Sequence, residues 1–308
     1  METGKERTVL VTGARGFIGR ATCKLLRCKG YRVIALDRDG GSDPLENPPS
    51  EPGEVNCDIS EASSLRFVFD LGQIDTIVHL AAILPTATQR DPMRATSVNI
   101  MGSMHLLEMA SRFKVRRFVF GSSISVYGSG APQERVTETS RTTPQDGYGA
   151  AKVYVERMGE SFRERNHVEF VSLRIGRVVG PGLNSTTSAW RGEIFDRLDT
   201  VEVADISLPY AGNERILLLH VEDVARMVDA LVAAERLSYG VYNALCDWVV
   251  VSELKRQVEF LNPRIRLHLG NDEAMGNPRW VDASRFERKF SFQMVPIFEQ
   301  LKRALEKG

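Results

Sequence analysis

The first half of the chain alternates short apolar runs with longer amphipathic segments. Four runs rich in β-branched residues are almost continuously apolar, at residues 8–12, 31–36, 75–80 and 117–122. Apolar residues at helical spacing occupy stretches between them, at 17–29, 62–71 and 91–113. Strands that are apolar on both faces are typical of a parallel sheet covered by helices on both sides. The pattern therefore predicts an α/β fold with a doubly wound parallel sheet.

The second half is less regular and predicts a second, smaller lobe. A helix at 148–166 and a strand at 169–174 continue the first pattern, and after Gly176 the predicted elements become shorter. The expected division is a dinucleotide-binding domain of residues 1–177 and 214–245, and an interleaved C-terminal substrate lobe of residues 178–213 and 246–308. Ligands of doubly wound sheets bind outside the carboxyl ends of the strands, so the chemistry is expected there.

Composition and charge narrow the class of protein. The chain has 308 residues, and 40 Lys and Arg balance 40 Asp and Glu. Without net charge, neither nucleic acid nor a membrane surface is an expected partner. The four cysteines form no CxxC pair, and no metal site is expected. No apolar run approaches the roughly 20 residues of a membrane span, and no signal peptide is recognisable, so a cytoplasmic protein is expected.

The segment TGARGFIG, residues 12–19, joins the first predicted strand to the first predicted helix. Gly13 permits a tight turn, Gly16 lets backbone N–H groups approach a pyrophosphate, and Gly19 lets helix and strand pack closely. This setting predicts a Rossmann-type dinucleotide site. The turn residues also expected to contact the cofactor are Arg15, Phe17 and Ile18.

A carboxylate that ends the second strand completes the fingerprint and bears on the choice of cofactor. Asp37 can accept hydrogen bonds from an adenosine ribose diol and would repel a 2′-phosphate, which favours NAD. Arg15 and Arg38 are guanidinium groups of the kind that accommodate NADP, so NADP stays the alternative. Asp58 and Ile59 end the third short β run and are expected beside the adenine ring.

The candidate reacting groups are a phenol and an ammonium one helical turn apart. Tyr148 and Lys152 lie on the same face of a predicted helix. The positive charge of Lys152, added to that of an oxidised nicotinamide, is expected to lower the pKa of Tyr148 from about 10, so that the phenol can take a proton from a substrate hydroxyl. Ser123 ends the fifth strand and is expected to bind the same substrate oxygen. Ser122 and Ser125 compete for that role, although alternation along a strand puts only one of two adjacent residues on a given face.

Taken in order, these motifs resemble the extended short-chain dehydrogenase/reductase superfamily, in particular its NAD-dependent nucleotide-sugar epimerase/dehydratase group. The motifs are TGARGFIG at 12–19, Asp37, CDI at 57–59, HLAA at 79–82, VN at 98–99, SSISVYG at 122–128, YGAAK at 148–152, LRIGRVVGPG at 173–182 and HVEDVA at 220–225. The resemblance implies a Rossmann fold that binds NAD, a Ser123–Tyr148–Lys152 triad and a lobe that binds a nucleoside-diphosphate sugar. The cofactor contacts expected in addition are Leu80, Ala81, Ala82, Asn99, Tyr148, Lys152 and Ile175.

The reaction that the resemblance implies is that of a UDP-sugar 4-epimerase, which oxidises a ring hydroxyl to a ketone and returns the same hydride to the other face. Members that eliminate water carry Asp-Glu after the catalytic hydroxyl, whereas Ile124 and Ser125 follow Ser123 here. A dehydratase is therefore disfavoured. An epimerase-reductase is also disfavoured, because no cysteine lies near Ser123.

Two departures keep a second function open. Arg177 stands where the family has asparagine, and Arg215 is one residue away from the family's arginine, and both are positions that bind the substrate diphosphate in the family. The alternative is an NAD(P)-dependent dehydrogenase or ketoreductase acting on a smaller hydroxy or keto compound. A non-catalytic NAD sensor is a third possibility, which the intact triad disfavours.

The expected substrate contacts come from segments that should face the cleft. They are Thr86, Ser123, Arg177, Asn184, Trp190, Arg191 and Arg215. Guanidinium groups among them are suited to bidentate phosphate contacts. In related proteins the helices corresponding to 91–113 and 148–166 pair between subunits. A homodimer is therefore expected, with an apolar face supplied by Met101, Met104, Val155 and Met158.

Overall fold

The computed structural model describes residues 7–38, 53–128, 135–166, 168–183, 188–275 and 277–307. The chain divides into two compact units. The first unit comprises residues 1–126, 144–174 and 225–242, and the second comprises residues 127–143, 175–224 and 243–308.

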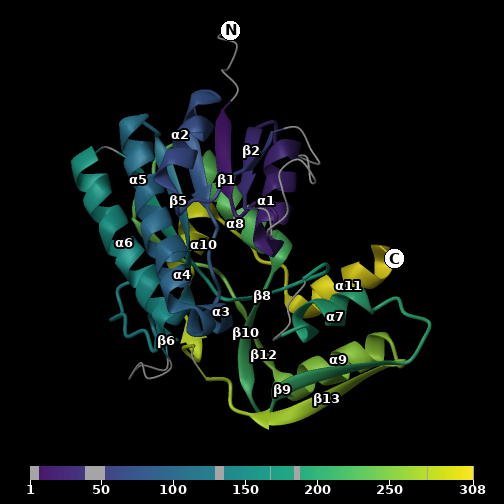
Figure 1. Ribbon diagram of the computed structural model, residues 1–308. Coiled ribbons are helices and arrows are strands. Elements are labelled where there is room, and N and C mark those ends of the chain that lie inside the picture. The colour runs from purple at the N-terminus through teal and green to yellow at the C-terminus, as the bar shows by residue number, and fades with distance from the viewer. Residues whose placement is uncertain are drawn as a thin grey trace. The chain divides into compact units, whose positions relative to one another are not determined.

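The first unit is built on a seven-stranded sheet with strand order β11-β7-β5-β4-β1-β2-β3 (Figure 1). The strands are β1 (Thr8–Thr12), β2 (Arg32–Asp37), β3 (Glu54–Asn56), β4 (Thr76–His79), β5 (Arg117–Ser123), β7 (Glu169–Ile175) and β11 (Val241–Asn243). The pairs β1–β2, β1–β4, β2–β3 and β4–β5 are parallel. The chain winds outward in both directions from β1, so the predicted doubly wound sheet is confirmed. Ligands of such sheets bind where the strand order reverses, here at β1 and β4.

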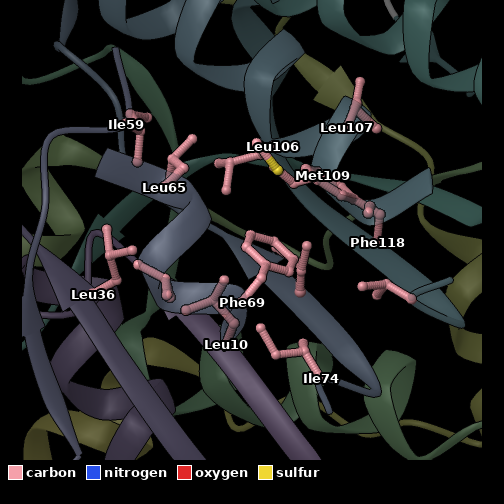
Figure 2. Close-up of a cluster of buried hydrophobic side chains, with 14 of the residues drawn as sticks. Leu10, Leu36, Ile59, Leu65, Phe69, Ile74, Leu106, Leu107, Met109 and Phe118 are labelled. Atoms are coloured by element: carbon pink, nitrogen blue, oxygen red, sulfur yellow. The ribbon is translucent and has the colours of Figure 1, made fainter. Parts of the chain in front are cut away.

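Helices cover this sheet because each carries an apolar stripe. They are α1 (Phe17–Cys28), α2 (Ala62–Asp70), α5 (Ser103–Arg112) and α6 (Gly147–Asn166), together with the C-terminal part of α8 (Val221–Ala233). Leu65 and Phe69 of α2 pack with Leu106 and Met109 of α5 in the core above Leu10 of β1 (Figure 2). Each such side chain contributes about 1.5–3 kcal/mol by leaving water.

The long helix predicted at 91–113 is confirmed as one continuous helical run over residues 92–112, with a π-helical stretch in its middle. It contains α4 (Pro92–Thr96), a π-helical stretch (Ser97–Gly102) and α5, and it is preceded by the short helix α3 (Pro85–Arg90). Asp91 separates α3 from α4 and caps α4 by accepting a hydrogen bond from the Arg94 N–H. A Cβ on Gly102 would lie 2.7 Å from a side-chain carbon of Ile59, so the π-helical stretch packs closely beside the predicted adenine site.

The second unit holds smaller sheets and its own core. Its strands are β6 (Arg135–Val136), β8 (Arg177–Val179), β9 (Ala204–Tyr210), β10 (Arg215–His220), β12 (Asp247–Val250), β13 (Ile265–Asp272) and β14 (Trp280–Val281). Its helices are α7 (Trp190–Asp196), α9 (Val251–Leu261), α10 (Ser284–Phe290) and α11 (Ile297–Lys307). The expectation that β10 returns to the main sheet is wrong, because β10 lies between β8 and β12. Ile216 and Leu218 of this strand pack into the core of the second unit instead.

The predicted dimer face is wrong in one residue. Val155 is fully buried in the core of the first unit, so it cannot contact another subunit. Met101 is 48% exposed, and Tyr154 of α6 is 45% exposed. The homodimer itself stays a prediction. Among the described residues, no helix is long and apolar enough to span a bilayer.

Candidate active site

The glycine-rich turn after β1 is packed too closely for side chains. Gly13 has a left-handed φ of +70°, and a Cβ there would lie 2.6 Å from the backbone nitrogen of Ala81. A Cβ on Gly19 would lie 2.0 Å from the carbonyl oxygen of Gly13. Both distances are far inside van der Waals contact. The turn, α1 and the residues after β4 can approach one another this closely only because glycine has no side chain.

Gly16 faces open space at the start of α1. Among the described residues, only the Gly13 carbonyl oxygen lies within 4 Å of a Cβ built on Gly16, at 3.1 Å. A pocket of about 260 Å³ opens here. The residues predicted from the sequence that line it are Gly13, Gly16, Asp37, Arg38, Asp58, Ile59, Leu80, Ala81 and Ala82. An open glycine turn at a helix N-terminus, with a carboxylate in the same pocket, fits the adenosine diphosphate part of NAD.

Backbone N–H groups hold both oxygens of the Asp37 carboxylate. The N–H of Arg15 donates to Oδ2 and the N–H of Arg38 donates to Oδ1, each at 2.7 Å. The carboxylate is therefore fixed at the pocket wall, and each oxygen keeps acceptor capacity for a ribose hydroxyl. The Arg15 guanidinium forms an ion pair with Glu54 of β3 at 3.3 Å, so a carboxylate partly compensates its charge.

Arg94 of α4 also lines the pocket and was missed in the sequence. Its guanidinium forms an ion pair with Asp58 and donates to the Ser60 hydroxyl at 3.0 Å. Burial opposes the ionisation of Asp58, but hydrogen bonds from Ser60 and Arg94 outweigh burial and hold the pKa of this carboxyl below its usual value. The signal that could have located Arg94 is Pro92 after Asp91, a helix start that puts Arg94 in the first turn.

Asn99 shapes the loop after β4 from the π-helical stretch. Its side-chain oxygen accepts a hydrogen bond from the Ile83 N–H at 2.7 Å, and its Nδ2 donates to the Ile83 carbonyl at 2.9 Å. Both polar groups of the amide are therefore engaged. Asn99, predicted as a direct cofactor contact, acts on the pocket through Ile83, which lines it.

His79 is a structural residue at the end of β4. Its Nδ1 lies 2.7 Å from the Thr12 hydroxyl, and its Nε2 lies 2.9 Å from the Ser103 hydroxyl. Burial, reinforced by the charge of Lys152, lowers the pKa of His79 to about 3. The imidazole is therefore neutral at physiological pH and links β1, β4 and α5.

Helix α6 begins beside the end of β5 because of two local features. The Asp146 side chain caps the helix by accepting a hydrogen bond from the Gly149 N–H at 2.6 Å. A Cβ on Gly149 would lie 2.7 Å from the Ser125 carbonyl oxygen. Glycine therefore lets the first turn of α6, which carries Tyr148, lie against the backbone that follows Ser123.

Ser123, Tyr148 and Lys152 meet at the carboxyl end of β5. The Ser123 hydroxyl hydrogen-bonds to the Tyr148 phenol. Lys152 Nζ lies 5.4 Å from the centre of the Tyr148 ring and donates to the Gly121 carbonyl at 2.7 Å. Ser122 instead donates to Glu156, so Ser123 is the serine beside the phenol. A hydroxyl, a phenol and an ammonium so arranged can exchange a proton with a substrate hydroxyl.

Burial governs the pKa of Tyr148 in the chain itself. Burial raises it to about 12; the hydrogen bond from Ser123 lowers it, and the Asp146 carboxylate raises it. Burial also lowers the pKa of Lys152 to about 7. The charge of Lys152 alone therefore does not make the phenol acidic, because desolvation of two buried groups disfavours both charged forms. The expected lowering by Lys152 together with an oxidised nicotinamide stays a prediction.

Some predicted residues belong neither to the glycine pocket nor to the group of Ser123, Tyr148 and Lys152. Phe17 and Ile18 begin α1 without lining the pocket, Thr86 is exposed on α3, and Ile175 ends β7 in the second unit. Asn184 lies outside the described residues. Across the described ranges, no group of three or more His, Cys, Asp or Glu side chains could hold a metal ion.

Three of the predicted substrate residues lie together with Tyr210 in the second unit. We call this group of four residues the arginine cluster (Arg177, Trp190, Arg191 and Tyr210). The Arg177 guanidinium lies 5.1 Å from the centre of the Tyr210 ring, which Trp190 contacts edge-on at 6.2 Å. Arg191 donates twice to the Ser188 hydroxyl, at 3.0 and 2.7 Å. Burial lowers the pKa of Arg191 to about 10, and the like charge of Arg177 lowers it further. The buried Trp190 Nε1 has no hydrogen-bond partner among the described residues.

Arg215 lies apart from the arginine cluster. Arg177 pairs with Leu218 of β10, and alternation puts residues 215 and 218 on opposite faces of the strand. The Arg215 guanidinium lies 4.1 Å from the centre of the Trp248 ring. The structure therefore separates two arginines that the sequence suggested for one diphosphate.

Comparison with known proteins relates this site to one family. The NAD dependent epimerase/dehydratase family matches residues 9–244. A UDP-glucose 4-epimerase of Schizosaccharomyces pombe is 30% identical over 218 residues, which are 68% of this chain and 59% of that protein. A UDP-glucose 4-epimerase of Rhizobium leguminosarum bv. trifolii is 30% identical over 187 residues, 59% of this chain and 55% of that protein. The chain thus matches little more than half of these curated relatives' length.

Solved structures resemble the chain over nearly its whole length. The UDP-glucose 4-epimerase of Thermotoga maritima with UDP-glucose is 25% identical, with a TM-score of 0.82 over 97% of each chain. The L-threonine dehydrogenase of Phytophthora infestans has a TM-score of 0.85 over 97% of this chain and 98% of its own. It is 23% identical, so this similarity is one of fold. The chain is an enzyme that belongs to the NAD-dependent epimerase/dehydratase family.

Proposed function

We propose that this enzyme is an NAD-dependent 4-epimerase of a nucleoside-diphosphate sugar, with UDP-glucose as the first substrate to test. The observation that carries the proposal is the meeting of Ser123, Tyr148 and Lys152 at β5, next to the strand whose following loop lines the glycine pocket. The UDP-glucose 4-epimerases among the relatives support the substrate class.

In this proposal Tyr148 moves the proton. When bound, NAD supplies reversible hydride acceptance. The Tyr148 oxygen takes the proton of the sugar hydroxyl as that carbon is oxidised, and returns the proton to the ketone oxygen when the hydride comes back to the other face. The Ser123 hydroxyl holds the same oxygen. Because burial raises the pKa of the phenol to about 12, proton transfer needs positive charge, which Lys152 and an oxidised nicotinamide together provide.

The Asp37 carboxylate is proposed to select NAD over NADP. Replacing it, as Asp37→Ser, removes hydrogen bonds of about 1.5–3 kcal/mol from a charged acceptor, so NAD should bind roughly 10- to 100-fold more weakly. Binding of NADP should tighten, because the carboxylate no longer repels a phosphate. Titration calorimetry with both cofactors measures the two effects. Asp70→Ser is the control, since Asp70 is an exposed residue at the end of α2 that does not line this pocket, and an equal loss of NAD preference in the control would contradict the assignment.

The arginine cluster is proposed to bind the substrate diphosphate. Its polar groups are mainly N–H and O–H donors, and within the described residues neither arginine forms an ion pair with a carboxylate. Two guanidinium groups whose like charges repel are stabilised by an anion between them. The arginine cluster would supply positive charge to the diphosphate. One of its two arginines, Arg177, stands where the family has asparagine.

Arg191→Gln should weaken the binding of UDP about 10- to 100-fold, because each charged hydrogen bond contributes about 1.5–3 kcal/mol. Arg215→Gln is the matched control, since it also replaces an arginine by glutamine. Arg215 lies on the face of β10 opposite to Leu218, the residue that pairs with Arg177 of the arginine cluster. Calorimetric titration of UDP into both variants tests the assignment. Equal losses, or a larger loss in the control, would remove the cluster as the diphosphate site.

The second candidate function is a net dehydrogenase of a smaller substrate. The separation of Arg215 from the cluster favours it, because one of the two arginines expected at a diphosphate is engaged by Trp248. Absorbance at 340 nm distinguishes the two functions when enzyme, NAD and substrate are mixed. An epimerase leaves no lasting NADH, whereas a dehydrogenase accumulates NADH steadily.

A further inference from the structure

A buried carboxylate lies one helical turn beyond Lys152. Glu156 of α6 is 7% exposed, and its partner Arg174 of β7 is 4% exposed. Arg174 Nε donates to Oε1 at 2.9 Å, and its NH2 group donates to Oε2 at 2.6 Å. The Ser122 hydroxyl also donates to Oε1, at 2.6 Å. The mechanism above uses none of these three residues.

Three residues of α6 hold three consecutive residues at the end of β5. Tyr148 binds the Ser123 hydroxyl, Lys152 binds the Gly121 carbonyl, and Glu156 binds the Ser122 hydroxyl between them. Positions 148, 152 and 156 are spaced by four and share one helix face. The contact between Glu156 and Ser122 therefore adds a third point at which α6 holds the end of β5, next to the two contacts made by the reacting groups.

The charges around Lys152 give this contact an electrostatic role. Burial lowers the pKa of Lys152 to about 7, and Glu156 is the group that raises it. The other titratable groups that face Lys152 are His79 of β4, which is neutral, and the Tyr148 phenol; Arg174 approaches from β7 through Glu156. A neutral lysine could not stabilise a phenolate.

We propose that Glu156 is a positioning residue that keeps Lys152 in its ammonium form and holds the end of β5 for proton transfer. Arg174 in turn forms an ion pair with the Glu156 carboxylate in a buried setting, where a charge without a partner would be costly. The inference rests on the proposed role of Lys152 in the epimerase.

The test measures the protonation of Lys152 directly, without turnover. Protein labelled with ¹³C at the lysine ε-carbon is titrated by NMR, and the Lys152 signal is assigned with Lys152→Met. In Glu156→Gln the pKa of Lys152 should fall by about one unit or more, because the carboxylate is lost and no longer offsets the Arg174 charge.

Two further variants separate this role from packing. Glu156→Gln combined with Arg174→Gln removes both charges of the ion pair, so it tests the idea even where the single variant fails to fold. The pKa of Lys152 should still fall in this double variant. Glu156→Asp keeps the charge and should leave that pKa closer to the native value, even where the melting temperature drops. A Lys152 pKa in the double variant equal to that of the native protein would overturn the proposal.

Activity gives a second, separable readout. The ammonium is present below the pKa of Lys152 and lost as pH rises through it, so a lower pKa moves the alkaline loss of kcat/KM to lower pH. A native protein that shows no epimerisation refutes the proposed function, while the NMR shift still decides the role of Glu156. An NMR shift without any change in the pH profile would refute the catalytic part of this inference.

Discussion

Tyr148→Phe is expected to lower kcat by about 10²- to 10⁴-fold, the range that general acid–base groups contribute. The variant removes one oxygen, and the ring stays in the place where α6 packs against Ser125 through Gly149. Since Tyr148 does not line the glycine pocket, the affinity for NAD should stay close to native. Steady-state turnover and calorimetric NAD binding measure the two effects.

The control for this variant is Tyr154→Phe, which removes a phenol oxygen from the same helix at an exposed position. Its turnover should equal that of the native enzyme. Native turnover in Tyr148→Phe would exclude Tyr148 as the proton-transferring group. Loss of NAD binding together with turnover would show that the phenol acts on cofactor binding instead.

Gly13→Ala is expected to destabilise the first unit by about 2–6 kcal/mol and to abolish NAD binding. A left-handed φ of +70° costs a non-glycine residue about 1–3 kcal/mol, and overpacking costs about 1–3 kcal/mol more. The overpacking arises because the new Cβ would lie 2.6 Å from the Ala81 nitrogen, a backbone atom that cannot swing away. Urea unfolding and NAD titration measure the losses.

Gly30→Ala is a matched control for the backbone strain. Gly30 also has a left-handed φ, of +82°, but no heavy atom of the described residues lies within 4 Å of its Cβ position. Gly30→Ala should therefore cost only about 1 kcal/mol and leave NAD binding intact. Equal effects in the two variants would show that strain alone, without the close approach to Ala81, explains the glycine at position 13.

The sheet was predictable because its strands are apolar on both faces and end at glycine, aspartate or serine. The helix predicted at 91–113 was predictable from its apolar period, but that period did not show the π-helical stretch within it, where Gly102 packs against Ile59. Strand β10 was placed in the wrong sheet for a related reason. Its apolar run shows that both faces are buried but does not show which neighbours bury them.

Within the candidate site, the sequence identified residues that act through their position at strand ends. It missed Arg94 and Glu156, because each acts through a partner distant in sequence: Asp58 lies 36 positions from Arg94, and Ser122 lies 34 positions from Glu156. It also did not show that burial raises the pKa of Tyr148 in the chain itself. Helical spacing shows that Tyr148 and Lys152 are neighbours, but it does not reveal how deeply both are buried.

The central claim is that a hydride leaves the substrate carbon and returns to it while Tyr148 carries the proton. The most direct test converts UDP-glucose labelled with deuterium at C4, in the presence of NAD, and analyses the product by mass spectrometry. The account predicts UDP-galactose that retains the deuterium, without lasting absorbance at 340 nm. Product that has exchanged its deuterium with solvent, or UDP-glucose that stays unconverted, would contradict it.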